Sequence, residues 1–355
     1  DSSTIAAHMQ AQTTSKIKTF TIGFNEDKQN EADYARKIAN HLGTNHTELI
    51  LSANDAKNII PMIPAMYDEP FADSSQIPTY LVSKLARNDV KVALTGDGAD
   101  EILCGYNRYQ VSNKLWRKFK RIPHSMRKIG SQTISTIPAG VLNSLHKVFP
   151  MTNKSNNFSD RVFKGGRLLK TKNIDQFYLE FISYWNNPEE LVINSKEPKT
   201  ILNSNHENPC NMSNLERMMY LDLLSYLPGD ILTKVDRASM AVSLETRLPF
   251  MDHRLIEYAW SLPSEYKYRN NQTKWILKEV LNKYIPKQLY DRPKQGFGIP
   301  INEWLKGSLR EWAEDLLNEQ KLNKEGYFDA KKIREKWMQH QSGHSNWQHQ
   351  IWNIL

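Results

Sequence analysis

The chain has 355 residues, 39% of them hydrophobic, with nine Trp and fifteen Tyr, which is enough to bury one large core or two smaller ones. It has no run of eighteen apolar residues and no basic, apolar leader pattern at its start. Neither a membrane span nor export is therefore indicated, and the cytoplasm is the expected location. Cys104 and Cys210 are its only cysteines, which argues against a disulfide framework and a zinc site.

The formal net charge of +8 is spread unevenly, with a concentration of Lys and Arg in "NKLWRKFKRIPHSMRK". A basic segment of this kind can contact nucleic acid, an acidic domain or a membrane surface. More often it is a solvated helical face. Because no nucleic-acid-binding motif and no dense aromatic platform accompany it, the sequence predicts neither nucleic acid nor a membrane as a partner.

The first part of the chain alternates helix and strand signals. "DSSTIAAHMQAQ" predicts a helix capped by Asp and Ser oxygens. "IKTFTIGF" and "HTELIL" have the composition of strands, and "EADYARKIANHLG" between them predicts a helix that ends at Gly43. A helix over about 53–66, a loop, a helix over about 79–87 and a strand over 90–94 follow. This alternation predicts an α/β fold with a parallel sheet covered on both faces.

In such a fold each helix follows a strand, yet the helix that begins at Asp1 has none before it. We therefore expect that the sequence is a fragment and that a strand and a ligand-binding loop lie upstream, since a parallel sheet binds its ligand at the carboxyl ends of its strands. From residue 113 onward strand signals vanish and helical periodicity dominates. The expected organisation is an α/β part over 1–112 and a mainly helical part over 113–355.

Three acids follow the strand at 90–94, in "TGDGADE". Gly96 and Gly98 permit tight turns and close approach of a ligand, and the free amides of a helix start favour an anion. A helix starting here would bring Asp97, Asp100 and Glu101 to one side. Two interpretations stay open: the acids hold a magnesium ion beside a phosphate, or they cap the helix and complement its dipole.

Six segments in order give the chain a specific resemblance. They are "DSS", "TFTIGF", "DEPFADSSQIPTY", "LTGDGADEILCGYNRY", "YLPGDILTKVDRASMAVSLETRLPFMDHRL" and "RPKQGFGIP". Together they resemble the synthetase domain of glutamine-dependent asparagine synthetases, within the ATP pyrophosphatase (PP-loop) family. The resemblance implies a parallel-sheet PP-loop fold, of the adenine nucleotide alpha hydrolase-like type, with a mainly helical second half. "DSS" then resembles the end of the family's pyrophosphate loop, whose strand and glycines are expected upstream.

The resemblance also implies a nucleotide site in the part over 1–112. Asp1 and Asp100 would share a magnesium ion, and Ser2 and Ser3 would lie beside the pyrophosphate, although capping is the alternative role for both serines. Lys294 would close over the nucleotide, or else be an ordinary loop lysine. The implied nucleotide contacts are Asp1, Ser2, Ser3, Ile22, Gly23, Thr95, Gly96 and Lys294.

Asp97 departs from the family pattern, which commonly has Glu at this position for forming the acyl-adenylate. The shorter carboxylate matters where placement is critical, and it leaves the acceptor carboxylate open. Arg237 aligns best with the family's catalytic Lys, and Lys234 with a neighbouring basic position; fixed cations there would stabilise charge on the phosphates. The alternative is a structural salt-bridge network formed by Lys234, Asp236, Arg237, Glu245 and Arg247.

The implied reaction converts aspartate to asparagine at the expense of ATP. The carboxylate attacks the α-phosphate to give a β-aspartyl-AMP intermediate and pyrophosphate, and ammonia then displaces AMP. In the family the ammonia comes from an N-terminal glutaminase domain, which these 355 residues do not include. The alternatives are an amidotransferase acting on a sugar or peptide carboxylate, a nucleic-acid-binding protein and an inactive scaffold. A homodimer is the oligomeric state considered.

Overall fold

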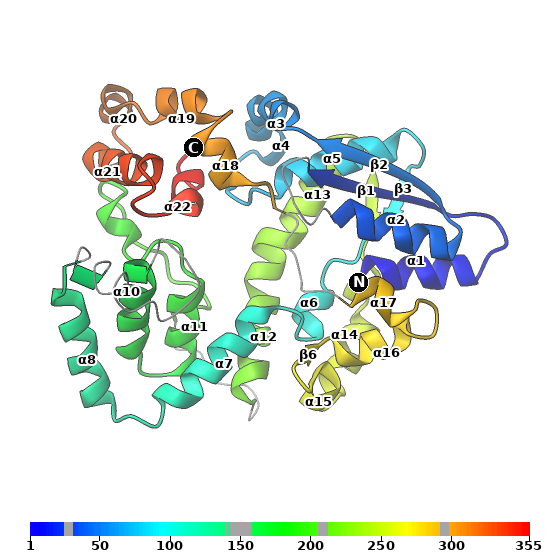
Figure 1. The fold of residues 1–355 in the computed structure, drawn as a ribbon, viewed down its shortest axis with the longest axis horizontal. Coiled ribbons are helices and arrows are strands. Elements are labelled where there is room, and N and C mark those ends of the chain that lie inside the picture. The colour runs from blue at the N-terminus through cyan, green and yellow to red at the C-terminus, as the bar shows by residue number, and fades with distance from the viewer. Residues whose placement is uncertain (25–30, 139–140, 143–157, 205–211, 292–297) are drawn as a thin grey trace. The chain divides into compact units, whose positions relative to one another are not determined.

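The computed structural model describes residues 1–24, 31–138, 141–142, 158–204, 212–291 and 298–355 (Figure 1). It contains two compact units, each made from two separate stretches of chain. The first unit is Asp1–Asn107 with Met219–Trp304, and the second is Arg108–Met218 with Leu305–Leu355. Whereas the expected parts over 1–112 and 113–355 are continuous, both units are discontinuous, because the chain returns to the first unit after building most of the second.

The first unit carries the strands. Its amino-terminal stretch confirms the predicted alternation of helix and strand and contains α1 (Ser2–Ala11), β1 (Lys18–Phe24), α2 (Glu31–Leu42), β2 (Asn45–Leu51), α3 (Ala53–Ile59), η1 (Ile60–Met62), α4 (Ile63–Tyr67), α5 (Gln76–Arg87), β3 (Val92–Leu94) and α6 (Ala99–Ile102). Strands β1 and β2 pair in parallel from Lys18 opposite Asn45 to Phe24 opposite Leu51. Helices α2 and α5 both contact these strands, and Figure 1 shows them on opposite sides.

The returning stretch of the first unit is not purely helical. It contains η3 (Leu227–Leu232), α13 (Thr233–Met240), β4 (Glu245–Arg247), η4 (Pro249–Met251), α14 (His253–Ser261), α15 (Ser264–Lys267), β5 (Tyr268–Arg269), β6 (Gln272–Thr273), α16 (Trp275–Leu281) and α17 (Lys287–Tyr290), and it ends within α18 (Ile301–Lys306). One apolar cluster joins the two stretches, since Ala7 and Ile38 of the amino-terminal stretch pack with Leu281 and Ile285 of the returning one.

The structure corrects two predictions. The expected helix over 53–66 is divided into α3, η1 and α4, because Pro61 and Pro64 lack the amide proton that a continuous helix requires. The second concerns strands, which the sequence does not predict beyond residue 112: α13 ends at Met240, and β4 follows a turn in which Ser243 has a φ of +57°. Strand β4 pairs in parallel with β3, so strand structure does continue beyond residue 112.

The second unit is helical apart from one isolated bridge between Val192 and Phe328 within the described residues. Trp116, Leu168 and Phe177 form one of its apolar clusters. Its helices are α7 (Asn107–Phe119), α8 (His124–Thr136), α10 (Phe158–Leu169), α11 (Ile174–Ile182), η2 (Pro188–Glu190), α12 (Asn214–Leu224, which continues into the first unit), α19 (Arg310–Leu316), α20 (Glu319–Glu325), α21 (Ala330–Gln341) and α22 (Gln348–Trp352). Among the described residues of either unit, no helix is both long and apolar enough to cross a membrane.

The end of β3 meets the start of α1 at Gly96. A Cβ atom on Gly96 would lie 2.4 Å from the backbone nitrogen of Ser2 and 2.8 Å from Cβ of Asp1. Both distances are too short for any side chain, and the backbone of α1 cannot move aside without disturbing its own packing. Glycine at this position therefore allows the close approach of two segments that are distant in sequence.

Gly96→Ala is expected to lower the free energy of unfolding by about 1–3 kcal/mol, because α1 must shift away from β3. The measurement is urea unfolding followed by circular dichroism. Gly229→Ala is the matched control in the same unit, since nothing lies within 4 Å of a Cβ atom there, and it is expected to be neutral or slightly stabilising. Equal midpoints for the two variants would contradict the role of Gly96.

Candidate active site

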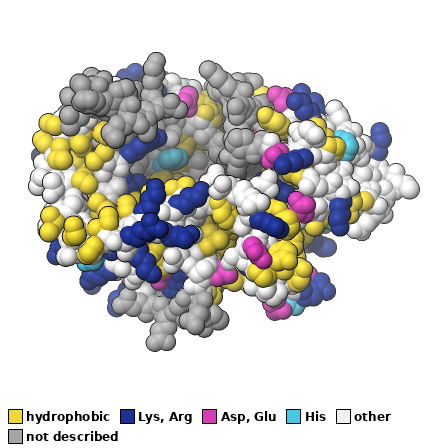
Figure 2. Space-filling model, turned by 60° about the horizontal axis from the view of Figure 1, so that its bottom comes forward, with side chains coloured by type: hydrophobic (Ala, Val, Ile, Leu, Met, Phe, Trp, Pro, Cys, Tyr) yellow, Lys and Arg dark blue, Asp and Glu magenta, His cyan; other side chains and the backbone are white. Residues whose placement is uncertain are grey.

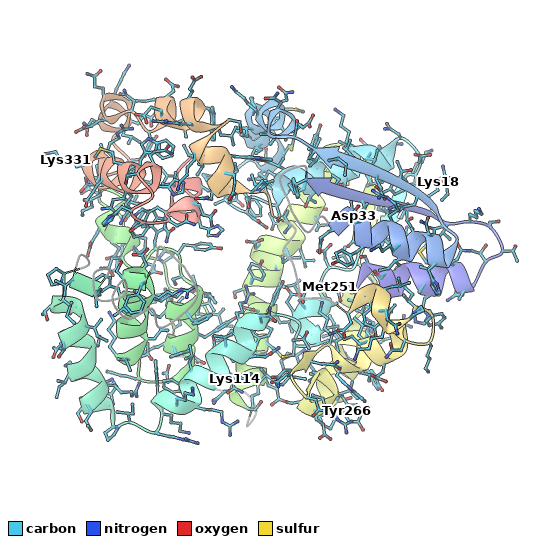
Figure 3. All side chains as sticks on the ribbon, viewed as in Figure 1. Lys18, Asp33, Lys114, Met251, Tyr266 and Lys331 are labelled. Atoms are coloured by element: carbon cyan, nitrogen blue, oxygen red, sulfur yellow. The ribbon has the colours of Figure 1, made fainter. Side chains whose placement is uncertain are left out.

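The candidate site lies where the "TGDGAD" turn leaves β3 and enters α6. Gly98 makes the turn with a φ of +89°, a backbone conformation that favours glycine. A Cβ atom on Gly98 would also lie 2.1 Å from Cε of Met251, the residue labelled at the centre of Figure 3. Position 98 therefore favours glycine mainly for its backbone conformation, since the end of the Met251 side chain could move aside.

A three-residue ion cluster forms beside this turn. The Lys274 ammonium lies 2.8 Å from Oδ1 of Asp100 and also contacts the carboxylate of Asp1. The Lys274 side chain is only 10% exposed, and those of Asp1 and Asp100 are 27% and 18% exposed. Charges with so little water around them are stable only when they are paired. The two carboxylates that the sequence assigns to one metal ion are thus brought together, around a lysine that the sequence analysis did not single out.

Lys274 occupies an unfavourable position for a lysine. It is the N-cap of α16 with a φ of +52°, a left-handed conformation that costs a non-glycine residue about 1 kcal/mol or more. A cation at a helix N-terminus is also opposed by the helix dipole. The ion cluster offsets both costs. Gly105 provides the space, since a Cβ atom there would lie 1.9 Å from Oδ1 of Asp100 and 2.1 Å from Cε of Lys274.

Asp1 and Asp100 fit a magnesium ion. Both carboxylates reach a single positive group, and Mg²⁺ in nucleotide sites takes one or two carboxylates, with phosphate and water oxygens completing its shell. Among the described residues, no cluster of three or more His, Cys, Asp or Glu side chains could hold a metal ion. Two carboxylates alone make a weak site, so Asp1 and Asp100 fit magnesium that arrives with a nucleotide better than magnesium bound permanently.

The start of α1 differs from the sequence prediction. Asp1 is the N-cap residue, but its side chain makes no capping hydrogen bond, and its carboxylate contacts Lys274 instead. Ser2 is exposed and Ser3 is half-buried in the first turn, where the amides of a helix have no intrahelical acceptor. This helix start therefore offers an anion both backbone donors and hydroxyl groups.

The other acids of the turn separate. Asp97 is half-buried, and within the described residues its carboxylate makes no hydrogen bond or ion pair. Glu101 is only 1% exposed and accepts a 2.7 Å hydrogen bond from the Tyr106 hydroxyl. Burial raises the pKa of Glu101. Asp97 thus remains available to a ligand, whereas Glu101 belongs to the core and does not join Asp97 and Asp100 on one side as expected.

Cys104 occupies the position at which the resembled family commonly has glycine. It is fully buried, and its φ is +57°, the left-handed conformation that explains why glycine suits this position. Burial raises the pKa of its thiol to about 12. Cys104 is therefore a packing residue with no thiolate at neutral pH.

The residues expected at the adenosine lie at the carboxyl ends of parallel strands. The Ile22 side chain is 2% exposed and packs in the core, so only its backbone and that of Gly23 can meet a ligand. The Thr95 amide donates to the Arg247 carbonyl oxygen at 3.0 Å, which extends the β3–β4 pairing to the edge of Gly96. Lys294 lies outside the described residues.

The two basic residues expected to be catalytic are engaged elsewhere. The Lys234 ammonium lies 2.8 Å from Oδ2 of Asp73 and 2.8 Å from Oγ of Ser75, and the Arg237 guanidinium lies 3.5 Å from Asp68. Lys234 is buried, whereas the Arg237 side chain is 49% exposed. Of the alternative salt-bridge network, only the Glu245–Arg247 pair forms internally. The catalytic roles of both residues stay predictions, and the geometry of Lys234 favours a structural role.

Asp73 was not singled out by the sequence analysis, although "DEPFADSS" places acids just before a buried helix. Burial acts to raise the pKa of Asp73, but the charge and hydrogen bond of Lys234, with those of Ser75, outweigh burial and lower it. An acid with a lowered folded pKa stabilises the fold above its unfolded pKa of about 4, and this contribution is lost as the pH falls through the folded value.

Lys234→Met is expected to lower the free energy of unfolding by about 3 kcal/mol near pH 7, because it leaves Asp73 ionised, buried and unpaired. The loss should shrink as the pH falls, because burial without Lys234 raises the pKa of Asp73 in the variant and its carboxyl then becomes protonated. Urea unfolding at several pH values measures both the loss of stability and its dependence on pH. Lys18→Met, which breaks the exposed Lys18–Asp89 pair, should cost less than about 1 kcal/mol. A loss that grows on acidification would contradict this assignment.

Lys274→Met is expected to lower stability without divalent cations and to make the protein respond to Mg²⁺, because the carboxylates of Asp1 and Asp100 then repel each other. Saturation tenfold above the dissociation constant would restore about 1.4 kcal/mol. Thermal unfolding with and without MgCl₂ measures this, again with Lys18→Met as the control. If Mg²⁺ shifted both midpoints equally, Asp1 and Asp100 would not be metal ligands.

Comparisons with known proteins show which sequences the chain resembles. An asparagine synthetase (glutamine-hydrolyzing) of Bacillus subtilis is 28% identical over 342 residues, which cover 96% of this chain and 51% of the relative. A Mycobacterium bovis protein provisionally named an asparagine synthetase is 29% identical over 358 residues, covering 100% of this chain and 52% of the relative. The amidase chyE of Penicillium rubens is 23% identical over 346 residues, which cover 89% of this chain and 48% of the relative.

The chain thus spans about half the length of the curated relatives that it matches. The family match runs from residue 1 to residue 355. On that match, the chain belongs to the asparagine synthase family.

Proposed function

We propose that this chain is the synthetase part of a PP-loop enzyme that forms an amide from a carboxylate, ATP and ammonia. Aspartate is the proposed acceptor and asparagine the product. The observation that carries the proposal is the convergence of Asp1 and Asp100 on one cation, Lys274, beside the free first turn of α1. A nucleoside triphosphate with its magnesium ion needs this combination of carboxylates, cation and backbone donors.

In the proposed first step, an oxygen of the acceptor carboxylate attacks the α-phosphorus of ATP. The bond between the α-phosphorus and the bridging oxygen breaks, and pyrophosphate leaves. The amides and hydroxyl groups of Ser2 and Ser3 bind phosphate oxygens, and Lys274 neutralises charge on the leaving pyrophosphate. Asp1 and Asp100 would hold magnesium, which supplies further charge neutralisation when bound.

In the second step, ammonia attacks the acyl carbon of β-aspartyl-AMP and AMP leaves. The nitrogen must lose a proton as the amide forms. Asp97 lies in the same turn as Asp100, is half-buried and has no protein partner among the described residues, so its carboxylate can orient the ammonia or accept that proton. The ammonia is proposed to come from a glutaminase domain, as the names of the bacterial relatives suggest.

A second candidate is an amidotransferase that acts on another carboxylate, such as that of a sugar or peptide. The observation that favours it is Asp97 itself, where the resembled enzymes commonly have Glu. A carboxylate one methylene shorter leaves more room for the acceptor and moves the charged group, and displacements of about 1 Å are enough to change reactivity greatly. One assay can separate the two candidates.

Aspartate-dependent release of pyrophosphate is expected from the protein that contains this chain, given ATP, MgCl₂ and ammonium chloride. Ammonium chloride removes the need for glutamine hydrolysis. Asp97→Ala should reduce the rate at least 100-fold if Asp97 takes part in proton transfer. Asp33→Ala is the control, since Asp33 pairs with Arg36 on the surface helix α2 (Figure 3), and its activity should be unchanged.

Release with a uronic acid or a peptide carboxylate, but not with aspartate, would replace the first candidate by the second. The absence of release with every carboxylate, at saturating ATP and ammonia, would contradict both candidates.

A further inference from the structure

The basic residues of the chain are concentrated in one stretch. Between Glu101 and Asp160 the sequence has ten Lys and Arg residues and no Asp or Glu. Because the formal net charge of the whole chain is +8, the remainder of the chain is slightly acidic. The described part of this stretch beyond Asn107 lies in the second unit and consists mainly of α7, α8 and their connection.

The connection between α7 and α8 is fixed from inside. The Arg127 guanidinium is buried and donates to the carbonyl oxygens of Ile122 at 3.2 Å, Leu169 at 3.2 Å and Thr171 at 2.8 Å. It also lies 5.5 Å from the centre of the Trp116 ring of α7, within the range of a cation–π interaction. These contacts tie the start of α8 to α7 and to the end of α10.

The inner side of α8 packs on α10. A Cβ atom on Gly166 would lie 2.9 Å from Cγ2 of Ile134, so glycine allows the two helices to approach closely. With this side of α8 held against the protein, the opposite side must face solvent. The packing of α8 on α10 therefore determines which side of α8 is exposed.

This exposed side carries large apolar side chains. Met126 and Ile129 are 61% and 63% exposed, the two most exposed aliphatic side chains among the described residues, and Ile122 is 42% exposed. Met126 and Ile129 are three residues apart on α8 and hence neighbours on its surface. One exposed apolar side chain is ordinary, but a group of them on one element indicates an interaction surface.

Exposed cations lie close in sequence to these apolar residues. Arg117, Lys118, Lys120, Arg121 and Lys128 are exposed, and within the described part of the chain none of them forms an ion pair. Figure 3 labels Lys114 on the adjoining α7, and Figure 2 shows a dark-blue group of Lys and Arg left of centre with hydrophobic side chains beside it.

Acids on the neighbouring helices do not cancel this charge. Glu180 of α11 pairs with Arg167 at 2.7 Å. Asp175 of α11 pairs with Arg217 at 2.8 Å. Both carboxylates are thus already neutralised, and the surface keeps its positive potential.

We propose that this surface, the α7–α8 face, docks reversibly on a bilayer that contains anionic lipids. Exposed apolar side chains on an element that is also rich in Lys and Arg match the interface of such a bilayer, where apolar side chains enter the acyl boundary and cations meet the headgroups. A nucleic acid or an acidic protein would use the cations but would leave Met126 and Ile129 in water. The proposal does not depend on the proposed reaction, because it concerns a separate surface of the second unit.

Sedimentation with vesicles tests the proposal, using the whole chain at about 0.15 M salt. Vesicles of phosphatidylcholine with about 30% phosphatidylserine should bind the protein, and vesicles of phosphatidylcholine alone should not. The double variant Arg117→Gln/Lys118→Gln should lower the partition coefficient roughly 25-fold, at about fivefold for each charge. Met126→Ser/Ile129→Ser should lower it roughly tenfold without changing the charge.

Matched controls place the same changes elsewhere in the second unit. Lys324→Gln/Lys331→Gln removes two exposed cations from α20 and α21, and Met338→Ser removes a side chain that is 58% exposed; both should bind within about twofold of the unmodified chain. All substituted side chains are exposed, and unchanged thermal midpoints would verify that each variant folds.

Three results would overturn the proposal. One is equal binding to both kinds of vesicle or to neither. Another is full binding by the Met126→Ser/Ile129→Ser variant, which would reduce the interaction to adsorption on any polyanion. The third is displacement of the protein from the vesicles by an equal charge of polyuridylic acid, which would identify nucleic acid as the preferred partner.

Discussion

The pairing of Lys274 with both Asp1 and Asp100 is the interaction on which the first unit most depends. It joins the start of α1, the turn after β3 and the N-cap of α16. Little water reaches any of the three side chains, so none of the charges can be left alone without a large loss of stability. Glycines at positions 96 and 105 leave the space that these charges occupy, since a Cβ atom would meet Asp1 at position 96 and Asp100 and Lys274 at position 105.

The same pairing connects stability with the proposed chemistry. Two carboxylates that face each other repel, and in the protein alone the lysine ammonium compensates for that repulsion. A nucleotide site needs the same two carboxylates for magnesium and the same cation for phosphate. On the proposed function, ligand binding would therefore redistribute charges that are already present, and their positions would be set before the ligand arrives.

Lysine has a different role at position 234. There a single ammonium neutralises one buried carboxylate, Asp73, and also contacts the Ser75 hydroxyl. This arrangement holds the segment before α5 against α13. Arg237, one turn later on α13, is half exposed. Similar residue types on one helix thus differ in burial and in partners, while a catalytic role stays a prediction for both.

Local sequence patterns determined the elements of the first 94 residues, since helix and strand periodicity and glycine or proline breaks act over a few residues. They also singled out Asp100 among the acids after β3, whereas Asp1 was assigned only through the family resemblance. They failed at β4, whose three residues become a strand only by pairing with β3 about 150 positions earlier. They also missed Lys274, whose local context disfavours a cation and whose partners lie far away in the sequence. Long-range pairing and burial decided these features, because a residue's partners across the fold leave no periodic signal in its own neighbourhood.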